Sequence, residues 1–254
     1  MFAPAHLRAP RRDRAILSGS LVALAAVAWL ALWVWQGSPA GQLLQHAGGG
    51  GPVPLEAALF TGGWILMIVA MMLPSSVPLV VTFGALVGRR RRPWVLVALL
   101  LVGYLLVWSA FGLGAWLADR GIHAAVDAIP WLAAHPQLIL ATTLLAAGLW
   151  QFSPLRDRCL DACRSPLGFV LNRWRGTSER REALTMGIAH GAFCVGCCWS
   201  LMLVMFGVGL GSMAWMFGLG AITAIEKNAT WGRRLGRPLG VALLLAGLTV
   251  VNAW

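Results

Sequence analysis

A histidine and three cysteines are spaced closely in the stretch His190–Trp199, which reads HGAFCVGCCW. In an α-helix their side chains fall within roughly 100° of one face, and neighbours at i+3 and i+4 have Cβ atoms about 5–6 Å apart. Thiolate, thioether and imidazole are ligands that Cu(I) favours, whereas Zn(II) prefers thiolate and imidazole in tetrahedral arrays. The spacing therefore predicts a soft-metal site, with copper(I) expected and zinc or iron as alternatives. The candidate ligands on this face are His190, Cys194, Cys197, Cys198 and Met202.

A second set of sulfur side chains lies in the sequence WILMIVAMMLPSSVP, where Met67, Met71 and Met72 precede two prolines. Methionine also fills irregular gaps in hydrophobic cores, so packing is the alternative role for these three residues. Pro74 and Pro78 each leave a backbone carbonyl without its helical donor, which predicts a kinked or broken helix. Because broken helices at mid-membrane depth often form binding sites, we interpret the three methionines as candidate ligands near the cysteines.

The remaining two cysteines, Cys159 and Cys163, lie in the sequence PLRDRCLDACRSP. Reducing cytoplasm and the bilayer interior both disfavour structural disulfides. Buried cysteine often packs as a small apolar group, but two tight groups with no cysteine elsewhere fit that role poorly. We expect Cys159 and Cys163 to form a cytoplasmic relay or acceptor pair for an ion held deeper in the membrane.

The composition indicates the setting of these residues. The chain has 254 residues, of which 59% are hydrophobic and 11% are charged, which is typical of a polytopic helical membrane protein. Its formal charge of +11 comes from arginines clustered between apolar segments. Such clusters favour a role in membrane topology over nucleic-acid binding, so we expect the lipid bilayer and no nucleic acid as a partner.

Hydropathy predicts an all-α bundle of about seven transmembrane spans. Basic clusters precede the first span and follow the second, fourth and sixth, so they all fall on one side of the membrane. This predicts a cytoplasmic N-terminus, an external C-terminus and a multi-pass location in the inner membrane. We expect a basic tail over residues 1–14 and a single transmembrane domain over 15–254, with an external loop at 36–56 and a cytoplasmic, cysteine-containing loop at 153–182. The predicted spans are Ala15–Trp35, Ala57–Val87, Trp94–Ala118, Gln137–Phe152, Ala183–Phe206, Ser212–Ala229 and Pro238–Ala253.

Charged residues inside the predicted spans are few. Glu226 and Lys227 end the sixth span, where an interfacial ion pair is expected and a proton or ion relay is the alternative. The sequence contains no convincing Ser-His-Asp or paired-carboxylate constellation and no Gly-rich phosphate loop. These features disfavour a hydrolase or an ATPase, and a non-enzymatic role is favoured.

Three blocks of the sequence resemble a family of bacterial inner-membrane proteins, a domain of unknown function with predicted metal binding. The blocks are WILMIVAMMLPSSVP, QFSPLRDRCLDACRSP and HGAFCVGCCWSLMLVMFGVGLGSMAWM, the last followed by EK. The resemblance extends roughly from Trp64 to Lys227, and its C-x-GCCW-x-LM block is specific. It implies a membrane protein that binds a metal ion, without implying which metal.

These observations together predict an inner-membrane protein that binds copper(I) and transports it, inserts it or passes it to a soluble or membrane partner protein. Two alternatives stay open. One is a thiol-disulfide oxidoreductase linked to a quinone, because CxxC motifs support thiol exchange. The other is a non-catalytic subunit whose cysteines pack or hold a structural ion.

Overall fold

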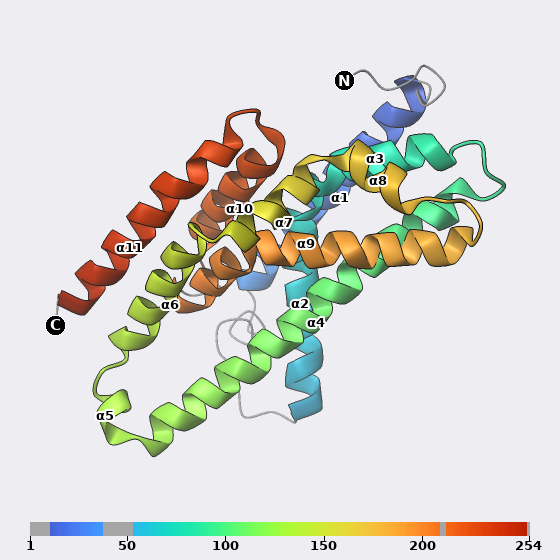
Figure 1. Ribbon diagram of the computed structural model, residues 1–254. Coiled ribbons are helices and arrows are strands. Elements are labelled where there is room, and N and C mark those ends of the chain that lie inside the picture. Colours follow the sequence, from blue (N-terminus) through green and yellow to red (C-terminus); the bar gives the residue numbers. More distant parts are fainter. Residues whose placement is uncertain (1–10, 38–52, 209–211, 253–254) are drawn as a thin grey trace.

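The structure, a computed structural model, describes residues 11–37, 53–208 and 212–252, and the regular secondary structure in these ranges is helical. Figure 1 shows the helices as one bundle in which the long helices α4 and α9 cross. The helices are α1 (Arg11–Gln36), α2 (Val53–Met71), α3 (Leu73–Val87), α4 (Pro93–Ala128), α5 (Pro130–Ala133), α6 (Gln137–Trp150), α7 (Pro154–Arg164), α8 (Pro166–Arg173), α9 (Glu179–Val208), α10 (Met213–Asn228), the 3-10 helix η3 (Gly232–Leu235) and α11 (Gly236–Asn252).

Five of the described helices are long and apolar enough to cross a membrane: α1, α2, α4, α9 and, together with η3, α11. A sixth span would form if α6 and α7, which meet at a 67° bend, were counted together. The expected second span is split, which leaves α3 with 15 residues, and α10 has only 16. Both are shorter than the about 20 residues that a perpendicular span needs. Five to six candidate spans agree with a helical membrane bundle, while seven spans and their orientation stay predictions.

The expected break is present between α2 and α3, just before Pro74, whereas Pro78 lies inside α3. Because Pro74 has no N–H, the carbonyl of Ala70 has no helical donor, and the indole Nε1 of Trp29 on α1 donates to it at 3.1 Å. The hydroxyl of Ser75 donates to the carbonyl of Met72 at 2.7 Å. The Trp29 bond satisfies the freed carbonyl of Ala70 inside the protein, as a break at membrane depth requires.

Helices α4 and α9 approach each other closely because glycines face the contact. A Cβ atom on Gly187 would lie 2.0 Å from the carbonyl oxygen of Leu100, and one on Gly103 would lie 2.3 Å from that of Leu184. Small residues allow such backbone contact between membrane helices. This packing brings the central part of α4 against the cysteine-bearing face of α9.

Segment 153–182, expected as a loop, is largely helical. Ser153 caps α7 by accepting a hydrogen bond from the backbone N–H of Leu155 at 3.2 Å, and Pro154 occupies the first turn. Helix α7 packs against α9, and α8 follows after Ser165. Figure 1 shows α6 and α11 side by side, with α7 turning away from α6 toward α9.

Two other predicted boundaries differ from the helix ends. Of the expected basic tail at 1–14, residues 1–10 lie outside the described residues, and Arg11–Arg14 already belong to α1. Most of the expected external loop at 36–56 also lies outside them, while Gln36 ends α1 and Val53–Glu56 begin α2. Helices therefore extend further into both segments than hydropathy predicts.

Large apolar side chains cover the outer surface of several helices. Examples are Trp33 and Val34 of α1, Phe217 of α10 and Leu245 of α11, each more than half exposed. A soluble monomer rarely exposes so much contiguous apolar surface, whereas helices facing lipid do. The outer surface is therefore compatible with a membrane setting.

Candidate metal centre

The three cysteines of α9 lie on one buried face, as the helical spacing predicts. Cys194, Cys197 and Cys198 are each at most 2% exposed and belong to the central hydrophobic core. The thiols of Cys197 and Cys198 both donate to the backbone carbonyl of Cys194, at 3.1 and 2.9 Å. Their sulfur atoms therefore gather around the Cys194 turn of the helix.

The Cys194 thiol contacts two polar side chains from other helices. The phenol oxygen of Tyr104 on α4 lies 3.1 Å from its Sγ, and the Nζ of Lys227 on α10 lies 2.9 Å away. Lys227 also donates to the hydroxyl of Ser75 at 3.4 Å. A buried ammonium group is costly unless it has partners. The contact of Lys227 with Cys194 therefore indicates a role for a positive charge beside the sulfur atoms.

The expected ion pair between Glu226 and Lys227 is wrong. Glu226 instead forms a buried ion pair with Arg156 of α7, while Lys227 points into the cysteine-bearing core. Adjacent residues on a helix point about 100° apart, so the two side chains face different neighbours. Lys227, together with Tyr104, is a site residue that the sequence analysis did not identify as a neighbour of the thiols.

Met72, at the break between α2 and α3, is the methionine that reaches the cysteines. Its Sδ lies 3.9 Å from the Sγ of Cys198 and 4.0 Å from the Nζ of Lys227. Met71 packs instead against Gly220 of α10, and Met67 borders a small gap beside Leu32 of α1. The break turns only one of the three expected methionines toward the thiols.

The second pair of cysteines lies against the first group, not apart from it. Cys163 on α7 interacts through its thiol with the thiol of Cys197. The Sγ of Cys159 lies so close to the backbone of Gly196 on α9 that a Cβ there would be 2.6 Å from it. We call these side chains the sulfur cluster, and its members are Cys159, Cys163, Cys194, Cys197, Cys198 and Met72.

The two remaining candidate ligands, His190 and Met202, are buried on the same helix as the cluster. The Nε2 of His190 lies 3.2 Å from the hydroxyl of Ser76, and its ring stacks on Tyr104. Its Nδ1 is buried and has no hydrogen-bond partner among the described residues. Met202 is fully buried in the central core. Both residues stay candidate ligands, and within the described residues neither forms a hydrogen bond with a thiol.

The ligand types of the sulfur cluster, thiols and one thioether, favour a soft metal ion. Within the described ranges, no three His, Cys, Asp or Glu side chains form a group able to hold a metal ion. Zinc sites are mostly four-coordinate and tetrahedral, whereas thiolate and thioether groups select Cu(I). Cys197 interacts with the thiols of Cys163, Cys194 and Cys198, and Cys198 contacts the thioether of Met72, so the cluster combines the thiol and thioether groups that Cu(I) favours.

A family model described as PpoB2, copper chaperone, matches residues 61–250, about three quarters of the chain. The matched range begins within α2, ends within α11 and contains every residue of the sulfur cluster. No curated protein and no solved structure matches the chain significantly.

Proposed function

Since the chain belongs to the copper chaperone family PpoB2 and its function is related to copper, we propose that it is a multi-pass inner-membrane protein that binds copper(I) in the sulfur cluster and passes the ion on. Copper is the cargo in this proposal, and the thiols are exchangeable ligands. A soluble or membrane partner protein would deliver or receive the ion. Candidate ligands are Cys163, Cys197, Cys198 and Met72, with Cys194 beside them.

The observation that supports this proposal most strongly is the adjacency of Cys163 and Cys197. It joins the cysteines of α7, at the end of the α6–α7 pair, to those of α9 in the core. On the same buried face of α9, Cys198 contacts Met72 at the break of α2 and α3. An ion could then move by exchanging one sulfur ligand at a time, without ever being released into the low-dielectric interior.

Copper binding to thiols releases their protons, because the thiolate is the metal ligand. A Cu(I) ion held by two thiolates carries a net negative charge. The ammonium group of Lys227, 2.9 Å from the Sγ of Cys194, lies where it would neutralise that charge. Its position gives the otherwise costly buried lysine a chemical role in the proposal.

Metal analysis of protein purified under anaerobic conditions tests the proposal. Copper, zinc and iron per chain would be measured for the wild type and for a Cys197→Ser, Cys198→Ser double variant. Met186→Leu provides a matched control, because Met186 is a buried sulfur residue of a separate core cluster. We expect copper in the wild type and the control and its loss in the double variant. Equal copper in all three would overturn the assignment.

The second candidate function is thiol-disulfide exchange, which the contact between the Cys163 and Cys197 thiols also favours. Oxidation of both thiols to a disulfide would release two protons and two electrons, which a quinone would take up as it is reduced to a quinol. Quinone reduction by the reduced, metal-free protein, lost in Cys163→Ser, would support this function. No quinone reduction would exclude it.

A further inference from the structure

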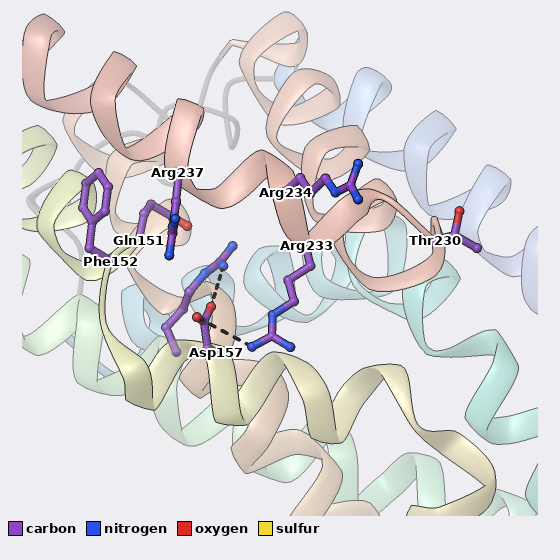
Figure 2. Close-up of a pocket in the computed structure, with 8 residues that line it drawn as sticks. Gln151, Phe152, Asp157, Thr230, Arg233, Arg234 and Arg237 are labelled. Carbon is purple, nitrogen blue, oxygen red and sulfur yellow. Dashed lines mark hydrogen bonds and ion pairs between the residues drawn. The ribbon is translucent and has the colours of Figure 1, made fainter.

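A cavity of about 770 Å³ lies where the ends of α6, α7, η3 and α11 meet. We infer that it is a binding site for a phosphate group, a site separate from the sulfur cluster. Figure 2 shows Gln151 and Arg237 close together above Asp157, Arg233 reaching down beside Asp157, and Arg234 pointing away. The lining residues are Gln151, Phe152, Arg156, Asp157, Thr230, Arg233, Arg234 and Arg237.

The charge of this cavity is that of an anion site. Four of its lining residues are arginines and one is an aspartate. Asp157 is shared between Arg156, at 3.3 Å, and Arg233, at 3.9 Å, and these two arginines also pair with Glu226 and Asp161, respectively. Arg237 forms no ion pair with any side chain that the structure describes. Arginine presents a planar set of donors that matches phosphate oxygens in pairs, so its charge is available to a phosphate ligand.

Two buried polar groups at the cavity lack the partners that a ligand would provide. Gln151 is 2% exposed, and neither its amide nitrogen nor its amide oxygen has a hydrogen-bond partner among the described residues. The Nε of the buried Arg156 also has none. Leaving such a group unsatisfied costs about 1–3 kcal/mol. The amide N–H groups and the Arg156 Nε–H can donate to phosphate oxygens, and the amide oxygen can accept from a hydroxyl of the ligand.

The backbone around the cavity is packed to bring these groups together. A Cβ atom on Gly236 would lie 2.5 Å from a guanidinium nitrogen of Arg156, and one on Gly240 would lie 2.9 Å from the Cβ of Gln151. Glycine at these two positions therefore allows the start of α11 to lie against Arg156 and Gln151. The arginines and the glutamine consequently line a partly open cavity bordered by four helical segments.

The position of the cavity fits a phosphate group from one of two sources. It lies at helix ends, beside the half-exposed aromatic side chains of Phe152 and Trp231. Aromatic residues are frequent at the membrane–water interface, and basic pockets between transmembrane helices bind anionic lipid headgroups. The headgroup phosphate of phosphatidylglycerol, whose glycerol hydroxyls could donate to Gln151, and free inorganic phosphate share the required chemistry.

Binding measurements on the full-length protein in detergent test this inference. Native mass spectrometry would count bound phosphatidylglycerol, with phosphatidylcholine as the neutral-headgroup comparison, and calorimetry would measure binding of inorganic phosphate. The variants are Arg237→Gln and Gln151→Leu. Arg181→Gln, which makes the same charge change at an exposed residue of α9 away from the cavity, is the matched control.

Removal of one arginine from such a site should weaken binding about fivefold, because a basic side chain near an anionic lipid contributes about 1 kcal/mol. We expect that loss in Arg237→Gln, a loss of the same sign in Gln151→Leu, and wild-type binding in Arg181→Gln. Selective loss of phosphatidylglycerol identifies a lipid headgroup as the ligand, and loss of inorganic phosphate identifies the free ion. The inference is overturned if neither probe binds, or if Arg237→Gln and Arg181→Gln bind equally. Copper content, measured in parallel, should be unchanged in all three variants.

Discussion

The ammonium nitrogen of Lys227 lies 2.9 Å from the sulfur of Cys194 in the interior of the helical bundle. Only 6% of Lys227 is exposed, and its other partners are the hydroxyl of Ser75 and the sulfur of Met72. Burial of a charge at this position is expensive and would not arise from packing alone. These contacts join the buried Lys227 side chain directly to the sulfur cluster.

Replacing Lys227 with methionine should weaken copper(I) binding at least tenfold. A charge about 4 Å away contributes about 4 kcal/mol at an effective dielectric constant of 20, and part of that is lost with the ammonium group. Competition with a Cu(I) chelator would measure the affinity, and Lys227→Arg should restore most of it. The metal-free variant should unfold at the same or a higher temperature, because a buried charge has been removed. Unchanged copper affinity would mean that Lys227 has only a structural role.

The three methionines before the helix break should differ in their contribution to copper binding. Met72→Leu should weaken it, because the Met72 sulfur lies 3.9 Å from the thiol of Cys198. Met71→Leu and Met67→Leu are matched controls that face Gly220 and the gap beside Leu32. The Leu-for-Met change nearly conserves volume and costs less than about 1.5 kcal/mol in stability. Equal affinity in all three variants would exclude Met72 as a ligand.

Mild oxidation should join Cys163 to Cys197, because their thiols interact across the contact of α7 and α9. Peptide mapping by mass spectrometry would identify the disulfide in wild-type protein, and Cys159→Ser should still form it. Copper(I) loaded before oxidation should protect both cysteines. A disulfide found only between Cys159 and Cys163 would place α7 away from the core cysteines, as the sequence analysis expected.

Close packing of α4 and α9 should be needed for copper binding at the sulfur cluster. Gly187→Ala places a methyl group 2.0 Å from the carbonyl oxygen of Leu100, so the helices must separate. Overpacking of this kind costs about 1–3 kcal/mol, and it should also reduce copper binding by moving Tyr104 away from Cys194. Gly114→Ala on α4, with nothing within 4 Å of the added Cβ, should be neutral or slightly stabilising. Thermal unfolding in detergent measures both variants.

Local patterns in the sequence predicted the features that depend on one helix. The i, i+3 and i+4 positions of Cys194, Cys197 and Cys198 placed them on one face, and all three are buried together. The prolines at 74 and 78 predicted the broken helix, because the missing N–H groups are a local property of the chain.

Features that depend on contacts between helices could not be read from the pattern. Helical spacing does not reveal which neighbouring helix a side chain faces. An ion pair between Lys227 and Glu226 was therefore predicted. The contact of Cys163 with Cys197 depends on the bend of 67° between α6 and α7, which directs α7 against α9. Hydropathy also predicts a loop where α7 and α8 lie, because the many charged residues of α7 lower the mean hydropathy of this segment.

X-ray absorption spectroscopy of the copper-loaded protein tests the central claim most directly. Wild-type protein should show Cu(I) with sulfur ligands only, and the Cys197→Ser, Cys198→Ser variant should lose the copper or replace sulfur by oxygen or nitrogen. Copper bound through nitrogen and oxygen in the wild type, or an unchanged sulfur shell in the variant, would contradict a copper site built from the thiols of α7 and α9.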